Sequence, residues 1–85
     1  MTVTTPDWLA RHDCQLRLVE HGAAWAVYLG NEPQYLLQLV PVAGKHGCKV
    51  TQTINGRRLD NGTAHATPEE ALQAGLEDLR RYLGW

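Results

Sequence analysis

The stretch TPEEALQAGLEDLRRYLG, residues 67–84, decides the fold class because it has the pattern of one amphipathic helix with a defined start. Thr67 supplies a capping hydroxyl, Pro68 suits the first helical position, and Glu70 is the partner expected in a capping box. At 100° per residue the leucines of this stretch fall within about 60° of one another, with charged residues opposite them. The sequence therefore predicts a helix over 67–83 with one buried face.

Gly75 interrupts this helix at the edge of its leucine stripe. Glycine in a helix interior costs roughly 1 kcal/mol relative to alanine, so a structural reason for it is expected. Without a side chain, it allows the helix backbone to approach a neighbouring sheet closely. We therefore expect the helix to pack against a sheet at Gly75.

The chain before this helix has the pattern of antiparallel strands separated by turns. Alternating apolar and polar residues begin at Cys14 and end at His21 and Gly22, which indicates a first half-buried strand. Further strands are predicted at 24–29, 35–40 and 48–54, with a longer loop over 42–47. The pair Asn55 and Gly56 predicts a hairpin that leads to a fifth extended stretch, ending near residue 59 or covering 63–66.

Together these elements predict an α+β fold: one small domain over residues 1–85, with a four- to five-stranded antiparallel sheet. The long amphipathic C-terminal helix packs on one face of that sheet. A short N-terminal helix is expected where Thr5, Pro6 and Asp7 resemble a helix start that runs to about His12.

Composition excludes several classes of function. Eight Lys and Arg against nine Asp and Glu give no net attraction to nucleic acid or to an anionic membrane. No segment approaches the roughly 18 consecutive apolar residues of a membrane span, and no signal-peptide pattern is present. We expect a cytoplasmic protein with no membrane partner, whose two cysteines remain thiols.

The second and third predicted strands are apolar on both faces. One side carries Ala24, Ala26, Tyr28, Leu36 and Val40, and the other carries Trp25, Val27, Leu29, Leu37 and Leu39. An antiparallel sheet with one face in water should be polar on that face. Because one helix covers only one side, the second side either binds a partner or is covered by Trp8, Leu9 and Trp85 of the same chain.

We therefore predict a small non-enzymatic protein-binding module, regulator or inhibitor. Its binding surface is the apolar sheet face or, alternatively, a sheet edge, and its partner is another protein or a second copy in a homodimer. The face consists of Ala24, Ala26, Tyr28, Leu36 and Val40. No catalytic residue or cofactor is predicted, because the chain has neither paired catalytic carboxylates nor a glycine-rich phosphate loop.

Nucleic-acid binding is the first alternative. The basic residues Lys45, Lys49, Arg57 and Arg58 gather around the predicted loop and the turn that follows it. A short helix, then strands, then a closing helix is an order that resembles double-stranded RNA-binding domains, and this resemblance implies RNA as partner. In that family the final helix begins with lysines that meet phosphates, whereas glutamates here repel them. Protein is therefore the preferred partner.

Zinc binding is the second alternative. Two His-x-Cys elements are present, His12 with Cys14 and His46 with Cys48. In an extended chain, residues two apart face the same side, so each pair could present an imidazole and a thiolate together. Two such pairs would complete a tetrahedral zinc site. The competing interpretation is two core cysteines beside two solvated histidines.

Overall fold

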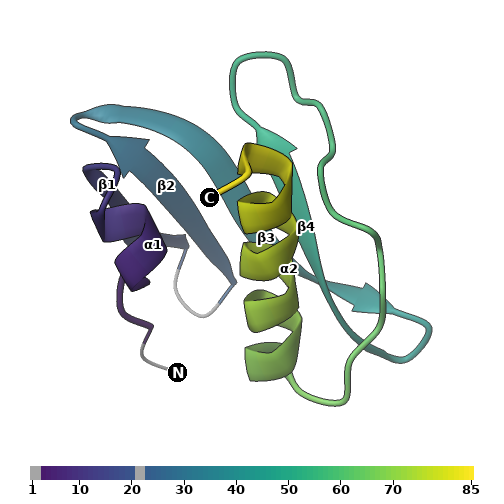
Figure 1. Cartoon of the computed structure of the whole chain (residues 1–85). Coiled ribbons are helices and arrows are strands. Elements are labelled where there is room, and N and C mark those ends of the chain that lie inside the picture. The colour runs from purple at the N-terminus through teal and green to yellow at the C-terminus, as the bar shows by residue number, and fades with distance from the viewer. Residues whose placement is uncertain (1–2, 21–22) are drawn as a thin grey trace.

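The predicted α+β fold is confirmed by the computed structural model, which describes residues 3–20 and 23–85 (Figure 1). The turn expected at His21 and Gly22 lies outside the described residues. The elements in chain order are α1 (Asp7–Ala10), β1 (Cys14–Glu20), β2 (Ala24–Leu29), β3 (Glu32–Val42), β4 (Lys45–Gln52) and α2 (Pro68–Leu83).

The four strands form one antiparallel sheet in the order β1-β2-β3-β4, so each strand pairs with its neighbours in sequence. Trp25 lies opposite Leu37, which in turn lies opposite Val50. These three side chains are buried on one face of the sheet. The register therefore places one continuous apolar row across the central strands.

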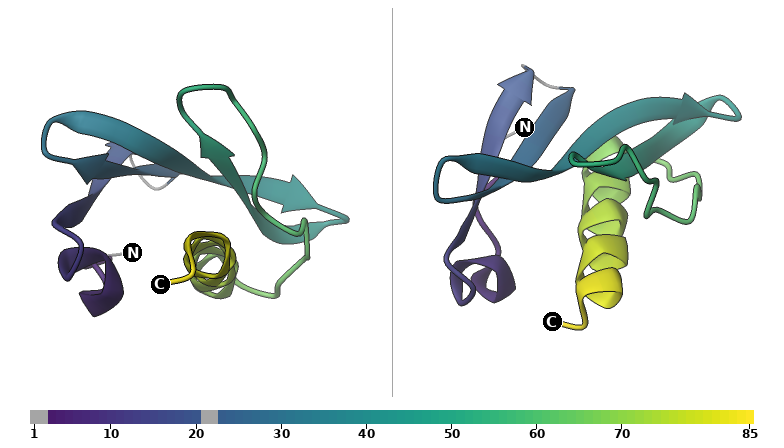
Figure 2. Two further views of the ribbon diagram at one scale, coloured as in Figure 1. Left: turned by 45° about the horizontal axis from the view of Figure 1, so that its top comes forward. Right: turned by 90° about the horizontal axis from the view of Figure 1, so that it is seen from above.

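Both helices pack on this same face (Figure 2). The contacts of α2 are with β4 and β3, whereas α1 contacts β1. The core between the helices and the sheet contains Leu9, Cys14, Leu16, Trp25, Val27, Leu37, Cys48, Val50, Ala71, Leu72, Leu76 and Leu79. The buried hydrophobic residues of both helices thus pack against one face of the sheet.

The C-terminal helix begins and ends as its sequence predicts. The Thr67 hydroxyl accepts a hydrogen bond from the Glu70 backbone N–H at 3.2 Å, and Pro68 occupies the first turn. At the other end Gly84 adopts φ +74°, and its N–H donates to the Arg80 carbonyl at 2.9 Å. Local capping chemistry therefore sets both boundaries of α2.

Gly75 is a point of very close approach between α2 and the sheet. A methyl group added there would lie 2.5 Å from the Cys48 Sγ, 2.9 Å from the Cys48 Cβ and 3.3 Å from the Val50 Cγ2. Separations below 3 Å are too short for carbon and sulfur atoms to tolerate without movement. The helix backbone packs directly on β4, as expected from the sequence.

The predicted loop over 42–47 is wrong, because β3 and β4 are joined by a tight turn. Ala43 and Gly44 have φ +49° and +76°, the positive values that a two-residue hairpin turn requires. Pro41 lies within β3 although it was expected to end the strand. The Leu39 N–H donates to the Ala23 carbonyl, so the Pro41 nitrogen points to the same side, beyond the point at which β2 begins at Ala24.

The fifth extended stretch runs back along the free side of β4 without forming a regular strand. It is joined to β4 by two isolated bridges, Thr51 with Arg58 and His46 with His65. The edge of β4 is consequently covered by the chain itself.

The N-terminal helix is shorter than predicted, since it ends at Ala10 and Asp13 follows with φ +59°.

Gly75→Ala should lower the free energy of unfolding by about 1–3 kcal/mol, because the added methyl overpacks the contact with β4. Helix propensity alone predicts the opposite, a gain of about 1 kcal/mol. Urea denaturation followed by circular dichroism measures the sign, with the exposed change Gln73→Ala as control. The loss should be smaller in a Cys48→Ala background, which removes the nearest atom. A stabilising Gly75→Ala would show that the contact is not tight.

Candidate functional site

The sheet face opposite the helices, here called the outer face, is built from alternate residues of all four strands. Ala26 lies between Arg17 of β1 and Leu36 of β3, and Leu36 pairs in turn with Thr51 of β4. The predicted binding residues Ala24, Ala26, Tyr28, Leu36 and Val40 alternate with the core residues and therefore share this face. Neither α1 nor α2 covers it (Figure 2).

These residues differ in how far solvent reaches them. Ala24 and Ala26 are each only 3% exposed, because longer side chains on the neighbouring strands flank their small methyl groups. Tyr28, Leu36 and Val40 are partly buried. The outer face thus has a shallow apolar centre over β2 and β3.

Polar side chains surround this centre. The Arg17 guanidinium lies 4.4 Å from the centre of the Tyr28 ring, a cation–π contact. Its Nε and Nη2 both donate to the Gln15 Oε1, at 3.1 and 2.8 Å. On β3, Gln38 lies between Leu36 and Val40 on this same face, and Lys49 of β4 lies opposite it. The described rim therefore offers cations and amide groups.

The residues expected as an internal cover lie elsewhere. Leu9 is completely buried in the core beneath the sheet, and Trp8 packs against that core. Trp85 stacks on the His12 ring, with centroids 3.8 Å apart and planes 7° from parallel. The three residues therefore sit with the helices and leave the outer face uncovered.

The free edge of the sheet is β1. Its Leu16 N–H donates to the Thr5 hydroxyl at 3.1 Å, and a register shift lies between Leu18 and Glu20. Leu18 and Val19 are 50% and 48% exposed. Alternation from Cys14 predicts Leu18 on the same side as the buried Leu16, but its side chain is half exposed. The exposure of Val19 could not be predicted from the alternation of apolar and polar residues, because the register shift between Leu18 and Glu20 interrupts that alternation.

The four basic residues of the nucleic-acid alternative are not gathered in one loop. Lys45 and Lys49 belong to β4, where alternation places both on the outer face, Lys49 opposite Gln38 and Lys45 at the hairpin end opposite Val42. Arg57 lies 6.0 Å from the centre of the Tyr82 ring. Arg58 has a structural partner instead: its Nε donates to the Asp60 Oδ1 at 2.8 Å and its Nη2 to Oδ2 at 3.0 Å.

Asp60 connects that arginine to the backbone of β4. Its side chain is only 1% exposed, and Oδ1 also accepts the Val50 N–H at 2.9 Å. Burial by itself would raise the pKa of this carboxyl, but the hydrogen bonds from Arg58 and Val50 outweigh it and the pKa is lowered. Asp60 is therefore ionised and satisfies an N–H at the covered edge of the sheet.

The two His-x-Cys pairs do not converge. Within residues 3–20 and 23–85, no group of three or more His, Cys, Asp or Glu side chains is arranged to hold a metal ion. His12 is used in the stack on Trp85, and Cys48 is buried beneath α2. The structure does not assemble the predicted four-ligand zinc site from His12, Cys14, His46 and Cys48.

Both thiols are poor nucleophiles. Burial raises the pKa of Cys48 to about 12, and the nearby carboxylates of Asp60 and Asp78 add to the effect. Burial and the Asp13 carboxylate also raise the pKa of Cys14. The thiolate is the reactive form of cysteine, so raised pKa values oppose catalysis.

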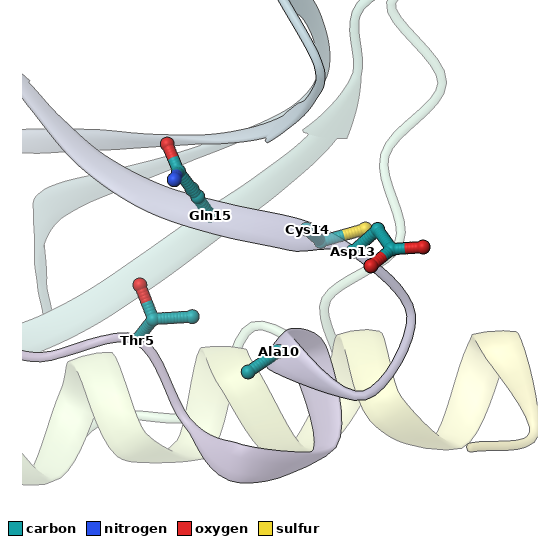
Figure 3. A pocket seen from close by; sticks show the side chains of 5 residues that line it. All are labelled: Thr5, Ala10, Asp13, Cys14 and Gln15. Carbon is teal, nitrogen blue, oxygen red and sulfur yellow. The ribbon is translucent and has the colours of Figure 1, made fainter.

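A cavity of about 410 Å³ lies beside Cys14 (Figure 3). Its lining consists of Thr5, Ala10, Asp13, Cys14 and Gln15. The only ionisable groups in this lining are one exposed carboxyl and one thiol with a raised pKa. Because the pKa of the Cys14 thiol is raised, this set supplies no activated nucleophile.

Comparisons with protein-family models, with curated proteins and with solved structures gave no significant match to this chain. Among the described helices, none combines the length and hydropathy needed to cross a lipid bilayer.

Arg58→Ala should lower the free energy of unfolding by about 1–3 kcal/mol, because it leaves the buried Asp60 carboxylate without its charged hydrogen-bond donor. Lys49→Ala, in the partly buried rim on β4, should change it by about 0.5 kcal/mol or less. Paired urea titrations of the two variants measure the difference. Equal effects would mean that Arg58 has no structural role.

Stability should decrease as the pH rises from 9 toward 12. In the unfolded chain the Cys48 thiol loses its proton near pH 9.0, the ordinary value for a cysteine, whereas in the folded protein its pKa is about 12. Proton release therefore favours the unfolded state across this window. Thermal denaturation of wild type and Cys48→Ala at several pH values tests this. The wild type should lose more stability than the variant, and parallel curves would contradict the assignment.

Proposed function

We propose that this protein is a small protein-binding module whose partner docks on the outer face of the sheet. The observation that carries the proposal is the placement of both helices on the same side. Over residues 3–20 and 23–85 of the chain, no helix consequently covers Tyr28, Leu36 and Val40 of the two central strands. The partner is another protein or a second copy of the chain.

The chemistry of the face defines what fits it. Interfaces between proteins commonly place apolar residues at the centre and polar residues at the rim. Here Leu36 and Val40 would lie at the centre, with Arg17 and Lys49 at the rim. The matching surface is apolar in its middle and carries carboxylates or carbonyl oxygens around it. Regulation or inhibition of a larger protein is the role that such a domain would serve.

A nucleic-acid function receives less support. Two of the four basic residues already have partners. Arg58 forms a salt bridge with Asp60, and Arg57 lies over the Tyr82 ring. Phosphate binding depends on several free cations acting together and weakens strongly with added salt. An apolar centre, in contrast, is what protein docking requires.

Leu36→Asp should abolish partner binding while leaving the domain folded, because it places a charge in the apolar centre of the interface. Ile54→Asp is the matched control, since Ile54 is 85% exposed in the turn after β4 and away from this centre. Self-association is measured by light scattering across protein concentrations, and other partners by capture from the native host followed by mass spectrometry.

The expected result is a dimer or a captured protein that is seen with wild type and Ile54→Asp but is lost with Leu36→Asp. Circular dichroism confirms that each variant is folded. A strict monomer that captures the same proteins with and without the Leu36 change would overturn the proposal. Capture of nucleic acid that depends on Lys49 and on low salt would favour the alternative instead.

A further inference from the structure

His46 and His65 lie directly opposite each other where the returning segment meets β4. The backbone N–H of His46 donates to the His65 carbonyl at 3.0 Å, and the His65 N–H donates to the His46 carbonyl at 2.7 Å. Residues paired in this way have their side chains on the same face, with Cβ atoms about 5.5 Å apart. The backbone therefore places the two histidine side chains at neighbouring positions on one face.

A chain of hydrogen bonds orients one of these rings. The Thr63 hydroxyl donates to the Asn61 Oδ1 at 3.0 Å, and it lies 3.0 Å from the His65 Nε2. A hydroxyl has one proton to donate, so towards His65 it acts as the acceptor. The hydrogen of the neutral ring is consequently on Nε2. The lone pair on Nδ1 is left available to a ligand.

This arrangement is typical of histidines that bind metals. A metal-binding imidazole usually donates its other N–H to a neighbouring oxygen, which fixes both the tautomer and the ring orientation. Two imidazoles at this spacing can each bring one nitrogen to about 2.1 Å from a shared ion. We propose that His46 and His65 together bind one divalent transition-metal ion such as Zn²⁺ or Cu²⁺.

The site differs from the zinc site considered from the sequence, with which it shares only His46. Cys48 is two residues along β4, but its sulfur lies against Gly75 beneath α2. Water completes the coordination, so the ion exchanges readily. Because an unfolded chain lacks the paired geometry, the ion also stabilises the edge formed by β4 and the returning segment. The inference is independent of the proposed docking surface.

Titration calorimetry with ZnCl₂ tests the site, using untagged protein stripped of metal at about pH 7.5. We expect one ion per chain and a higher melting temperature in its presence. Replacing either histidine, as His46→Ala or His65→Ala, should weaken binding at least tenfold. His12→Ala is the matched control and should bind as wild type does. Circular dichroism establishes that each variant is folded.

Thr63→Val gives a second, milder test because it keeps both rings and removes only the oxygen that orients His65. It should weaken zinc binding by about tenfold, which is less than the loss of either ring causes. Mg²⁺ in excess should not compete, since it prefers oxygen ligands. The proposal is wrong if wild type does not bind zinc, or if a variant lacking both histidines binds it equally well.

Discussion

The contact of the α2 backbone at Gly75 with Cys48 and Val50 of β4 determines how the rest of the molecule is arranged. It brings the leucine face of α2 onto β4 and β3 and leaves the β1 side of the same face to α1. Both helices are thereby used on one side of the sheet. The exposed outer face is a consequence of this packing, because no further helix is present among the described residues to cover it.

Features set by local chemistry could be predicted from the sequence. The boundaries of α2 follow from Thr67 and Gly84, and the role of Gly75 follows from its place beside the leucine stripe. The turn between β3 and β4 could not be predicted, because Ala43 has a positive φ that its residue type does not favour. Nor does the sequence indicate why Pro41 is tolerated, since this depends on where β2 begins relative to β3.

Alternation along β2 and β3 was sufficient to place the five outer-face residues on one side. Their exposure was not predictable, since Ala24 and Ala26 are shielded by side chains from neighbouring strands. The sequence also could not show which residues from different parts of the chain become neighbours. Spacing grouped His46 with Cys48, whereas the fold pairs it with His65. Arg58 was grouped with the other basic residues, whereas it binds Asp60. Such pairings depend on the course of the segment after β4, which has no regular pattern of its own.

The fold also favours the outer face over a sheet edge as the docking surface. On one side, the returning segment already occupies β4 through its backbone and through Asp60. On the other side, the Thr5 hydroxyl takes up the Leu16 N–H, and the irregularity near Val19 interrupts the strand. Bulges of this kind discourage the addition of a further strand. Because the β4 edge is occupied and the β1 edge is irregular, we propose the apolar centre around Leu36, rather than an edge, as the surface that a partner buries.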